Sequence, residues 1–242
     1  MHRLLVETSE LESDSPVLPK DAANHLRVLR PKNGEEIELF DGEGRSRVFS
    51  FDDGALRPAG GVSFASRPAP LTLFACVTKG SRWDWTIEKA TELGVTRIVP
   101  VISDRTIVRI PAGEREAKCA RWMRIAEDAA RQSDAKWLPE IMKPVDFSES
   151  LSLVRETRCF VGALASPPPQ MILKALMSTA DARLDSSFSL FVGPEGDFTP
   201  GELAALCEIA TPVSFGTTIL RAETAAIYGL SVLKAFLDVR AC

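Results

Sequence analysis

Apolar and polar positions divide the chain into two stretches with different periodicities. In residues 1–66, the runs at 3–6, 36–40 and 47–51 alternate apolar with polar positions, as half-buried strands do, and turn signals separate them. A helical repeat at residues 21–29 interrupts these strands. The pattern predicts a small β-rich module.

The second stretch, residues 71–242, alternates buried strands with helices. Near-continuous apolar runs are typical of parallel strands that are covered on both faces. Thr199, Pro200 and Glu202 give the pattern of a capping box with proline at the first helical position. The alternation favours an α/β fold with a mostly parallel sheet and helices on both sides. The predicted strands are 71–77, 97–102, 159–164, 188–192 and 213–215, and the predicted helices are 85–93, 114–132 and 223–239.

Composition narrows the class of protein. The chain has 242 residues, of which 45% are apolar, so it can bury a substantial core. It has no apolar run long enough to span a membrane, and its first residues turn acidic too early for a signal peptide. The five cysteines are scattered, which favours a reducing cytoplasm over a disulfide framework. With only two histidines, the chain is also poorly supplied with ligands for a metal site. We therefore expect a cytoplasmic protein without a membrane segment or a metal.

Charge is distributed unevenly. The formal net charge is −4, which by itself argues against a nucleic-acid binder. Residues 79–136 nevertheless contain more Lys and Arg than Asp and Glu. This local excess is compatible either with RNA contact or with ordinary solvated helices.

Two glycine-containing segments each follow a predicted strand and precede a predicted helix. They are residues 193–198 (GPEGDF) and 215–224 (FGTTILRAET). Ligands of open α/β sheets bind at the carboxyl ends of strands, and glycine lets the backbone approach a ligand closely. Neither segment is a dinucleotide-binding or P-loop motif. The two segments predict a pocket for a small ligand that is held by backbone groups.

These blocks, together with others, resemble those of the RsmE-type 16S ribosomal RNA uridine N3-methyltransferases. The resemblance extends over both predicted domains in the family's order. The matching blocks are residues 25–30 (HLRVLR), Gly34, 40–42 (FDG), 79–85 (KGSRWDW), 89–95 (KATELGV), 193–196 (GPEG), Phe198, Glu202 and 219–225 (ILRAETA).

The resemblance implies a fold, a cofactor and partners. It implies a PUA-like β-barrel over residues 1–66 that helps to hold RNA, followed over residues 71–242 by a SPOUT methyltransferase domain. The C-terminal part of that α/β domain would form a deep trefoil knot. S-adenosylmethionine would lie in the knot of a homodimer that methylates N3 of a specific uridine, uridine 1498, in 16S ribosomal RNA or the small ribosomal subunit.

The resemblance also assigns residues to the site. Arg221 is the candidate that stabilises charge developing on the uracil carbonyl oxygens, since its guanidinium stays charged; its structural alternative is an ion pair with Glu223. Glu195 is a candidate base or loop organiser, with helix capping as its alternative. The expected cofactor-binding residues are Leu164, Gly193, Pro194, Glu195, Gly196, Phe215, Gly216, Ile219, Leu220 and Thr224. The expected RNA-binding residues are Arg27, Arg30, Lys79, Arg82, Lys89 and Arg105.

Some positions have simpler interpretations or depart from the family pattern. Lys89 could pair with Glu92 along its helix, and Trp83 and Trp85 are interpreted as core residues in preference to platforms for base stacking. Departures stand at Asp197 and Asp134 where glycine is usual, and at Thr218, Arg131 and Ala135. Two alternatives therefore stay open: a related methyltransferase with another RNA target, and an RNA-binding or assembly factor that has lost its chemistry.

Overall fold

The chain divides into two compact units. The computed structural model describes residues 1–156, 158–165, 168–178 and 187–241. One unit comprises Met1–Pro68 together with Glu127–Leu138, and the other comprises Ala69–Ala126 together with Pro139–Cys242. Residues 127–138 thus belong to the first unit. The division expected from the sequence, at residues 66–71, assigns them to the second domain.

The first unit is built on a five-stranded sheet of order β1-β2-β3-β4, with β5 paired to β3. β1 and β2 are parallel, so two helices cross over between them, whereas the other pairs are antiparallel. Apolar residues such as Leu4, Ile37 and Phe49 are fully buried in its core. The elements are β1 (His2–Leu5), α1 (Thr8–Glu12), α2 (Lys20–Leu29), β2 (Glu35–Phe40), β3 (Arg45–Asp52), β4 (Ala55–Pro58) and β5 (Ser63–Phe64).

A buried charge cluster fastens residues 127–138 to this sheet. Arg3 Nε donates to Glu38 Oε2 at 2.6 Å, and both side chains are almost fully buried. The other guanidinium nitrogens of Arg3 donate to the carbonyl oxygens of Ala130 and Ala135, at 2.7 and 3.0 Å. Lys136 Nζ reaches Glu38 Oε1 at 2.6 Å. The first unit therefore depends on a segment from far along the chain.

Acid should destabilise both units through one buried carboxylate in each. Burial raises the pKa of Glu38, but hydrogen bonds from Lys136, Ser46 and Arg3 outweigh it and hold that pKa below its ordinary 4.5. In the second unit, burial also raises the pKa of Glu156, but hydrogen bonds from Ser189, Thr72 and the Arg155 backbone, together with the charge of Arg97, lower it by more. A depressed folded-state pKa contributes stability that is present above the unfolded value and is lost as the pH falls through the folded value.

We therefore expect the free energy of unfolding, measured by urea titration, to be flat down to about pH 5 and to fall below about pH 4.5. Proton uptake on unfolding in the acidic range, measured by potentiometry, checks the sign. Stability that rises as the pH drops below this range would contradict the assignment.

The second unit is a parallel sheet of order β12-β10-β11-β6-β7, extended at β7 by the short strands β8 and β9. Every strand pair in it is parallel. The expected mostly parallel α/β sheet is confirmed. The strands are β6 (Leu71–Cys76), β7 (Arg97–Ile102), β8 (Glu140–Ile141), β9 (Val145–Asp146), β10 (Arg158–Gly162), β11 (Phe188–Val192) and β12 (Thr211–Val213).

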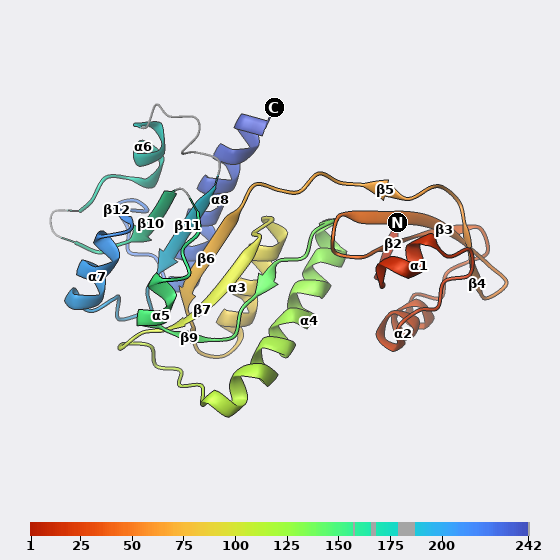
Figure 1. The fold of residues 1–242 in the computed structure, drawn as a ribbon, viewed down its shortest axis with the longest axis horizontal. Helices are drawn as coiled ribbons and strands as arrows, with labels where there is room; N and C mark the ends of the chain where they lie inside the picture. Colours follow the sequence, from red (N-terminus) through yellow and green to blue (C-terminus); the bar gives the residue numbers. More distant parts are fainter. Residues whose placement is uncertain (157, 166–167, 179–186, 242) are drawn as a thin grey trace. The chain divides into compact units, whose positions relative to one another are not determined.

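Helices cover both faces of this sheet, as Figure 1 shows. Alternate residues of β6 point to opposite faces: Leu73 packs in the cluster with α3, α4, α6 and α8, and Phe74 packs in the cluster with α5 and α7. The helices are α3 (Ser81–Glu92), α4 (Arg115–Ser133, preceded by a 3₁₀ turn at Ala112–Glu114), α5 (Phe147–Leu151), α6 (Ile172–Met177), α7 (Pro200–Cys207) and α8 (Ala222–Ala241).

Local signals explain where some of these elements begin. The predicted capping box is present at α7, because Thr199 Oγ1 accepts from Glu202 N at 3.2 Å and Glu202 Oε2 accepts from Thr199 N at 2.9 Å. α3 begins at Ser81, four residues before the predicted start. Its N-cap is Gly80 at φ 68°, without a side-chain cap, so the usual sequence signal is missing.

Candidate functional site

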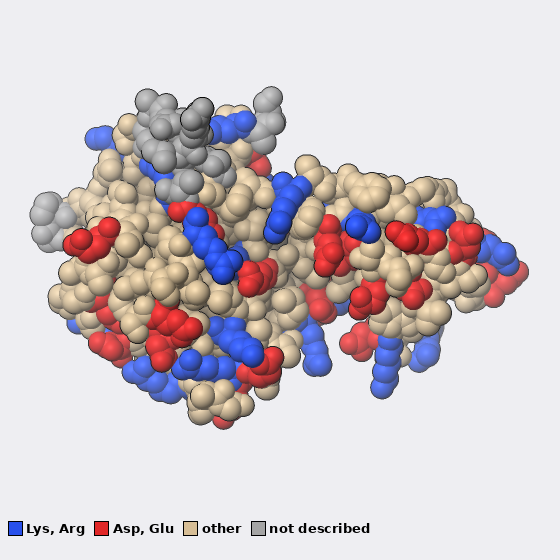
Figure 2. Space-filling view, viewed as in Figure 1, with Lys and Arg blue, Asp and Glu red and all other residues tan. Residues whose placement is uncertain are grey.

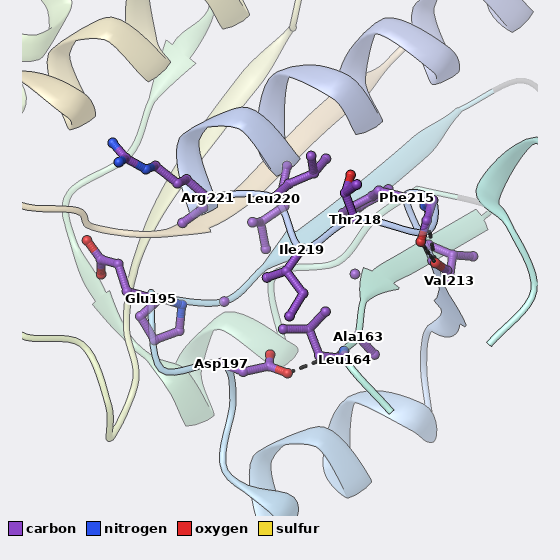
Figure 3. A pocket seen from close by; sticks show the side chains of 18 residues that line it. Ala163, Leu164, Glu195, Asp197, Val213, Phe215, Thr218, Ile219, Leu220 and Arg221 are labelled. Atoms are coloured by element: carbon purple, nitrogen blue, oxygen red, sulfur yellow. Dashed lines mark hydrogen bonds between the residues drawn. The ribbon is translucent and has the colours of Figure 1, made fainter. Parts of the chain in front are cut away.

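A cavity of about 270 Å³ opens where β10, β11 and β12 end (Figure 3). Its walls come from the three segments that follow these strands, as expected for a ligand site in a parallel sheet. Most of the lining is apolar side chain or glycine backbone, and the charged side chains in it are Glu195, Asp197 and Arg221. The predicted pocket formed by the two glycine-containing segments is therefore present.

Side chains fix the shape of the cavity walls. Asp197 Oδ1 accepts from Phe198 N at 2.8 Å, and Oδ2 accepts from Leu164 N at 3.4 Å, which joins the segments after β10 and β11. Ser214 Oγ accepts from Gly216 N at 3.2 Å and donates to Gly216 O at 3.0 Å, a local turn that holds the segment after β12. Two of the three walls are thus tied together, and the third is held locally.

Most predicted cofactor residues line this cavity, and two do not. Gly196 and Thr224 lie outside its lining: Thr224 lines an adjacent cavity, and the carbonyl oxygen of Gly196 accepts from Arg105 Nη1 at 2.8 Å. The predicted residues in the lining are Leu164, Gly193, Pro194, Glu195, Phe215, Gly216, Ile219 and Leu220.

Other lining residues were not singled out from the sequence. They are small or apolar residues at strand ends and at the start of α8, where an interpretation as core residues is equally natural. The only feature of the sequence that could have indicated them is that they lie next to or within the two glycine-containing segments or at the end of a predicted strand. They are Gly162, Ala163, Val192, Val213, Ser214, Ala222 and Ala225.

Arg221 does not form the ion pair with Glu223 that was the structural alternative to a role in the site. Glu223 Oε1 lies 3.8 Å from Arg82 Nε, and Arg82 Nη1 lies 3.3 Å from Glu195 Oε1. Within the part of the chain that the structure describes, the Arg221 side chain has no hydrogen-bond or ion-pair partner. Arg82 therefore links the two glycine-containing segments. Arg221 is exposed at the cavity, and its guanidinium has no partner among the described residues.

The six predicted RNA-binding cations differ in their surroundings. Lys89 Nζ contacts Glu88 at 2.8 Å and Glu92 at 2.7 Å, so its ordinary helical pairing is present, and the hydrogen bonds that Lys89 donates to these carboxylates raise its pKa. Arg82 and Arg105 contact the segment after β11. Arg27 contacts Asn24 on its own helix. Lys79 and Arg30 are exposed.

Charges of both signs are interspersed on the molecular face shown in Figure 2. Lys and Arg side chains alternate there with Asp and Glu, so this face carries no continuous basic surface.

The two neighbouring tryptophans have different environments, so one interpretation was wrong. Trp83 is 2% exposed and packs edge-on against Trp122, with ring centroids 5.5 Å apart. Trp85 is 40% exposed and is not a core residue. The reason is helical geometry, because residues two apart in a helix lie on different faces.

Two of the departures from the family pattern lie where the backbone is left-handed. Asp197 and Asp134 have φ of 59° and 61°, the left-handed conformation that suits glycine and that aspartate tolerates better than most residues. Asp134 and Ala135 both contact Arg3, and Arg131 pairs with Asp128. Thr218 is exposed at the cavity.

Neither a metal cluster nor a membrane helix is found among residues 1–156, 158–165, 168–178 and 187–241. The cysteines in these ranges, Cys76, Cys119, Cys159 and Cys207, are free thiols, and Cys242 lies outside them. Burial raises the pKa of Cys76 to about 11 and that of Cys159 to about 12, so these two thiols are unreactive at neutral pH.

Two family models match the chain. An RNA methyltransferase domain matches residues 65–234, and an RNA methyltransferase PUA domain matches residues 18–49. Among curated relatives, ribosomal RNA small subunit methyltransferase E of Synechocystis is 31% identical over 98% of this chain and 78% of its own length. The Bacillus subtilis protein of the same name is 30% identical over 70% of this chain and 68% of its own length.

A solved structure agrees with these matches. The ribosomal RNA small subunit methyltransferase E from Neisseria gonorrhoeae, bound to S-adenosylmethionine, superimposes with a TM-score of 0.82 at 26% identity and covers 97% of both chains. The family models, the curated relatives and the solved structure agree over both units. The chain therefore belongs to the RsmE-type family of ribosomal RNA small subunit methyltransferases.

Proposed function

We propose that this protein uses S-adenosylmethionine to methylate N3 of one uridine, uridine 1498, in 16S ribosomal RNA. The observation that carries the proposal is the cavity at the ends of β10, β11 and β12 with the uncommitted Arg221 beside it. The relatives that act on small-subunit RNA support the substrate, and the Neisseria protein bound to S-adenosylmethionine supports the cofactor.

The cavity suits this cofactor chemically. Apolar side chains such as Leu164 and Ile219 extend toward the same part of the cavity and would enclose the adenine ring (Figure 3). Backbone groups of the glycine-containing segments would meet its polar edges, and the carboxylates of Glu195 and Asp197 complement a ligand that carries positive charge. When bound, S-adenosylmethionine supplies an electrophilic methyl group on a sulfonium.

The residues of the chain account for the remaining requirements. Uracil N3 carries a proton that must leave, and charge then develops on the flanking carbonyl oxygens. Arg221 would stabilise that charge, because its guanidinium donates several hydrogen bonds and stays protonated. Glu195 is held by Arg82, which favours a role as loop organiser over a role as base.

Ile219 offers a direct test of the cofactor site. It lines the cavity although it is 80% exposed, so its replacement should not disturb the fold. We expect Ile219→Asp to weaken S-adenosylmethionine binding by roughly tenfold or more, since a buried apolar contact is worth about 1.5–3 kcal/mol. Isothermal titration calorimetry measures the dissociation constant.

Ile107→Asp is the matched control, because Ile107 is 70% exposed and lies outside the cavity lining. Equal affinities of the two variants would place the cofactor elsewhere. A folded wild-type protein that binds no S-adenosylmethionine would favour the alternative, an RNA-binding or assembly factor. If the cofactor binds, mass spectrometry of 16S RNA identifies the methylated nucleotide and distinguishes a related enzyme with another RNA target.

The other expectations belong to the same proposal. The PUA-like unit would help to hold RNA, and the segments after β10, β11 and β12 would form the trefoil knot. The protein would act as a cytoplasmic homodimer on 16S RNA or on the small subunit. These expectations stay predictions, and sedimentation velocity tests the homodimer.

A further inference from the structure

A second cavity, of about 430 Å³, adjoins the cofactor cavity. It is formed by the first turn of α3 and the start of α8, two helices that pack against each other. Arg221 lines both cavities, and the contact between Arg82 and Glu195 joins a residue of the second to a residue of the first. The lining residues are Ser81, Arg82, Trp85, Arg221, Glu223 and Thr224.

Trp85 is the aromatic residue in the lining of this cavity. Arg82 and Trp85 are three residues apart and share one face of α3, whereas Trp83 faces the core. A partly exposed indole that lines a cavity is suited to stacking on a planar, unstacked base, which is how proteins usually hold single-stranded RNA.

The charges around the indole match the reacting edge of uracil. That edge presents two carbonyl oxygens on either side of N3. The cavity presents two cations, Arg82 and Arg221, of which the first is oriented by Glu195 and Glu223 and the second is uncommitted among the described residues. Cytosine and adenine each present an amino group on this edge, which would face a cation that only donates. The pair of arginines therefore favours uracil.

We propose that this second cavity, the base cavity, receives the target uracil after it leaves the RNA stack. Trp85 stacks on the ring, and Arg82 and Arg221 donate to O2 and O4. The proposal rests on the proposed function. Methylation forms the N3–CH3 bond and breaks the S–CH3 bond, so the sulfonium becomes a neutral sulfide and the N3 proton passes to a base. Because Arg221 lines both cavities, it borders the cofactor and the base in this arrangement.

Photocrosslinking tests the base cavity without relying on turnover. The probe is a synthetic 16S RNA segment that the wild-type protein methylates, with 5-iodouridine at the methylated position. We expect irradiation to crosslink the iodouracil to Trp85, as located by peptide mass spectrometry. The same segment with 5-iodocytidine at that position should give little crosslinking.

Variants at Trp85 provide the second measurement. Trp85→Leu should lower kcat/KM for the RNA by roughly five- to a hundredfold, the usual range for a lost base-stacking contact. Trp85→Phe should recover most of it, and both should bind S-adenosylmethionine as the wild type does, because Trp85 does not line the cofactor cavity. Folding of each variant is checked by thermal unfolding.

Three outcomes would overturn the base cavity: a crosslink at another residue, an unchanged kcat/KM in Trp85→Leu, or a Trp85→Leu protein whose only change is its oligomeric mass in sedimentation. The last would identify Trp85 as a contact between copies of the chain. A wild-type protein that binds S-adenosylmethionine and methylates no 16S uridine would instead overturn the proposed function.

Discussion

Arg221→Ala is expected to slow methyl transfer by about 100- to 1,000-fold, with S-adenosylmethionine affinity changed only a few-fold. The magnitude is that of a lost preorganised donor to developing negative charge. Arg221 is suited to this role because Glu223 is engaged by Arg82 and leaves its guanidinium uncommitted beside the cavity. The measurement is single-turnover transfer of labelled methyl to 16S RNA at saturating protein.

Two variants make this result specific. Arg221→Lys keeps the charge but loses the planar fork, and should recover part of the rate. Arg124→Ala removes an exposed arginine of α4 that lines neither cavity, and should react as the wild type does. If Arg221→Ala retained the wild-type rate constant, the role proposed for Arg221 would be wrong.

The largest effect on stability should come from Arg97→Met, at about 3–5 kcal/mol. Arg97 and Glu156 form an ion pair at 3.4 Å with side chains only 6% and 5% exposed. Arg97 also donates to Leu153 O at 2.8 Å, and the hydroxyls of Thr72 and Ser189 donate to Glu156. Removing Arg97 alone leaves a buried carboxylate without its cation. Urea unfolding measures the loss.

The double variant Arg97→Met/Glu156→Leu should recover much of that loss, because an apolar pair can replace a buried ion pair. Arg121→Met is the exposed control: its ion pair with Asp84 lies at the surface and should contribute less than about 1 kcal/mol. Equal losses in Arg97→Met and Arg121→Met would refute a special role for burial.

The sequence predicted best those features that depend on neighbouring residues. The run at 188–192 coincides with β11, and the run at 97–102 with β7, because strands buried on both faces are continuously apolar. The capping box of α7 needs only residues three apart. The two glycine-containing segments were recognisable because they combine turn chemistry with a place at strand ends.

Features that depend on residues far apart in the chain could not be predicted from the sequence. Arg82 and Glu195 are 113 positions apart, so their contact could not be read from spacing. The local pair of Arg221 with Glu223, which was the structural alternative for Arg221, does not form, because Glu223 lies beside Arg82. Trp83 and Trp85 look alike in sequence, and only the orientation of α3 on the sheet distinguishes the buried ring from the exposed one. The return of residues 127–138 to the first unit likewise has no local signal.

That return determines when the amino-terminal unit can mature during synthesis. Domains generally fold as they emerge, amino-terminal first. Here the buried guanidinium of Arg3 needs the carbonyl oxygens of Ala130 and Ala135, and Glu38 needs Lys136. Translation must therefore pass residue 138 before the first 68 residues find their last partners, and the nascent sheet stays incomplete while residues 69–126 of the second unit are made.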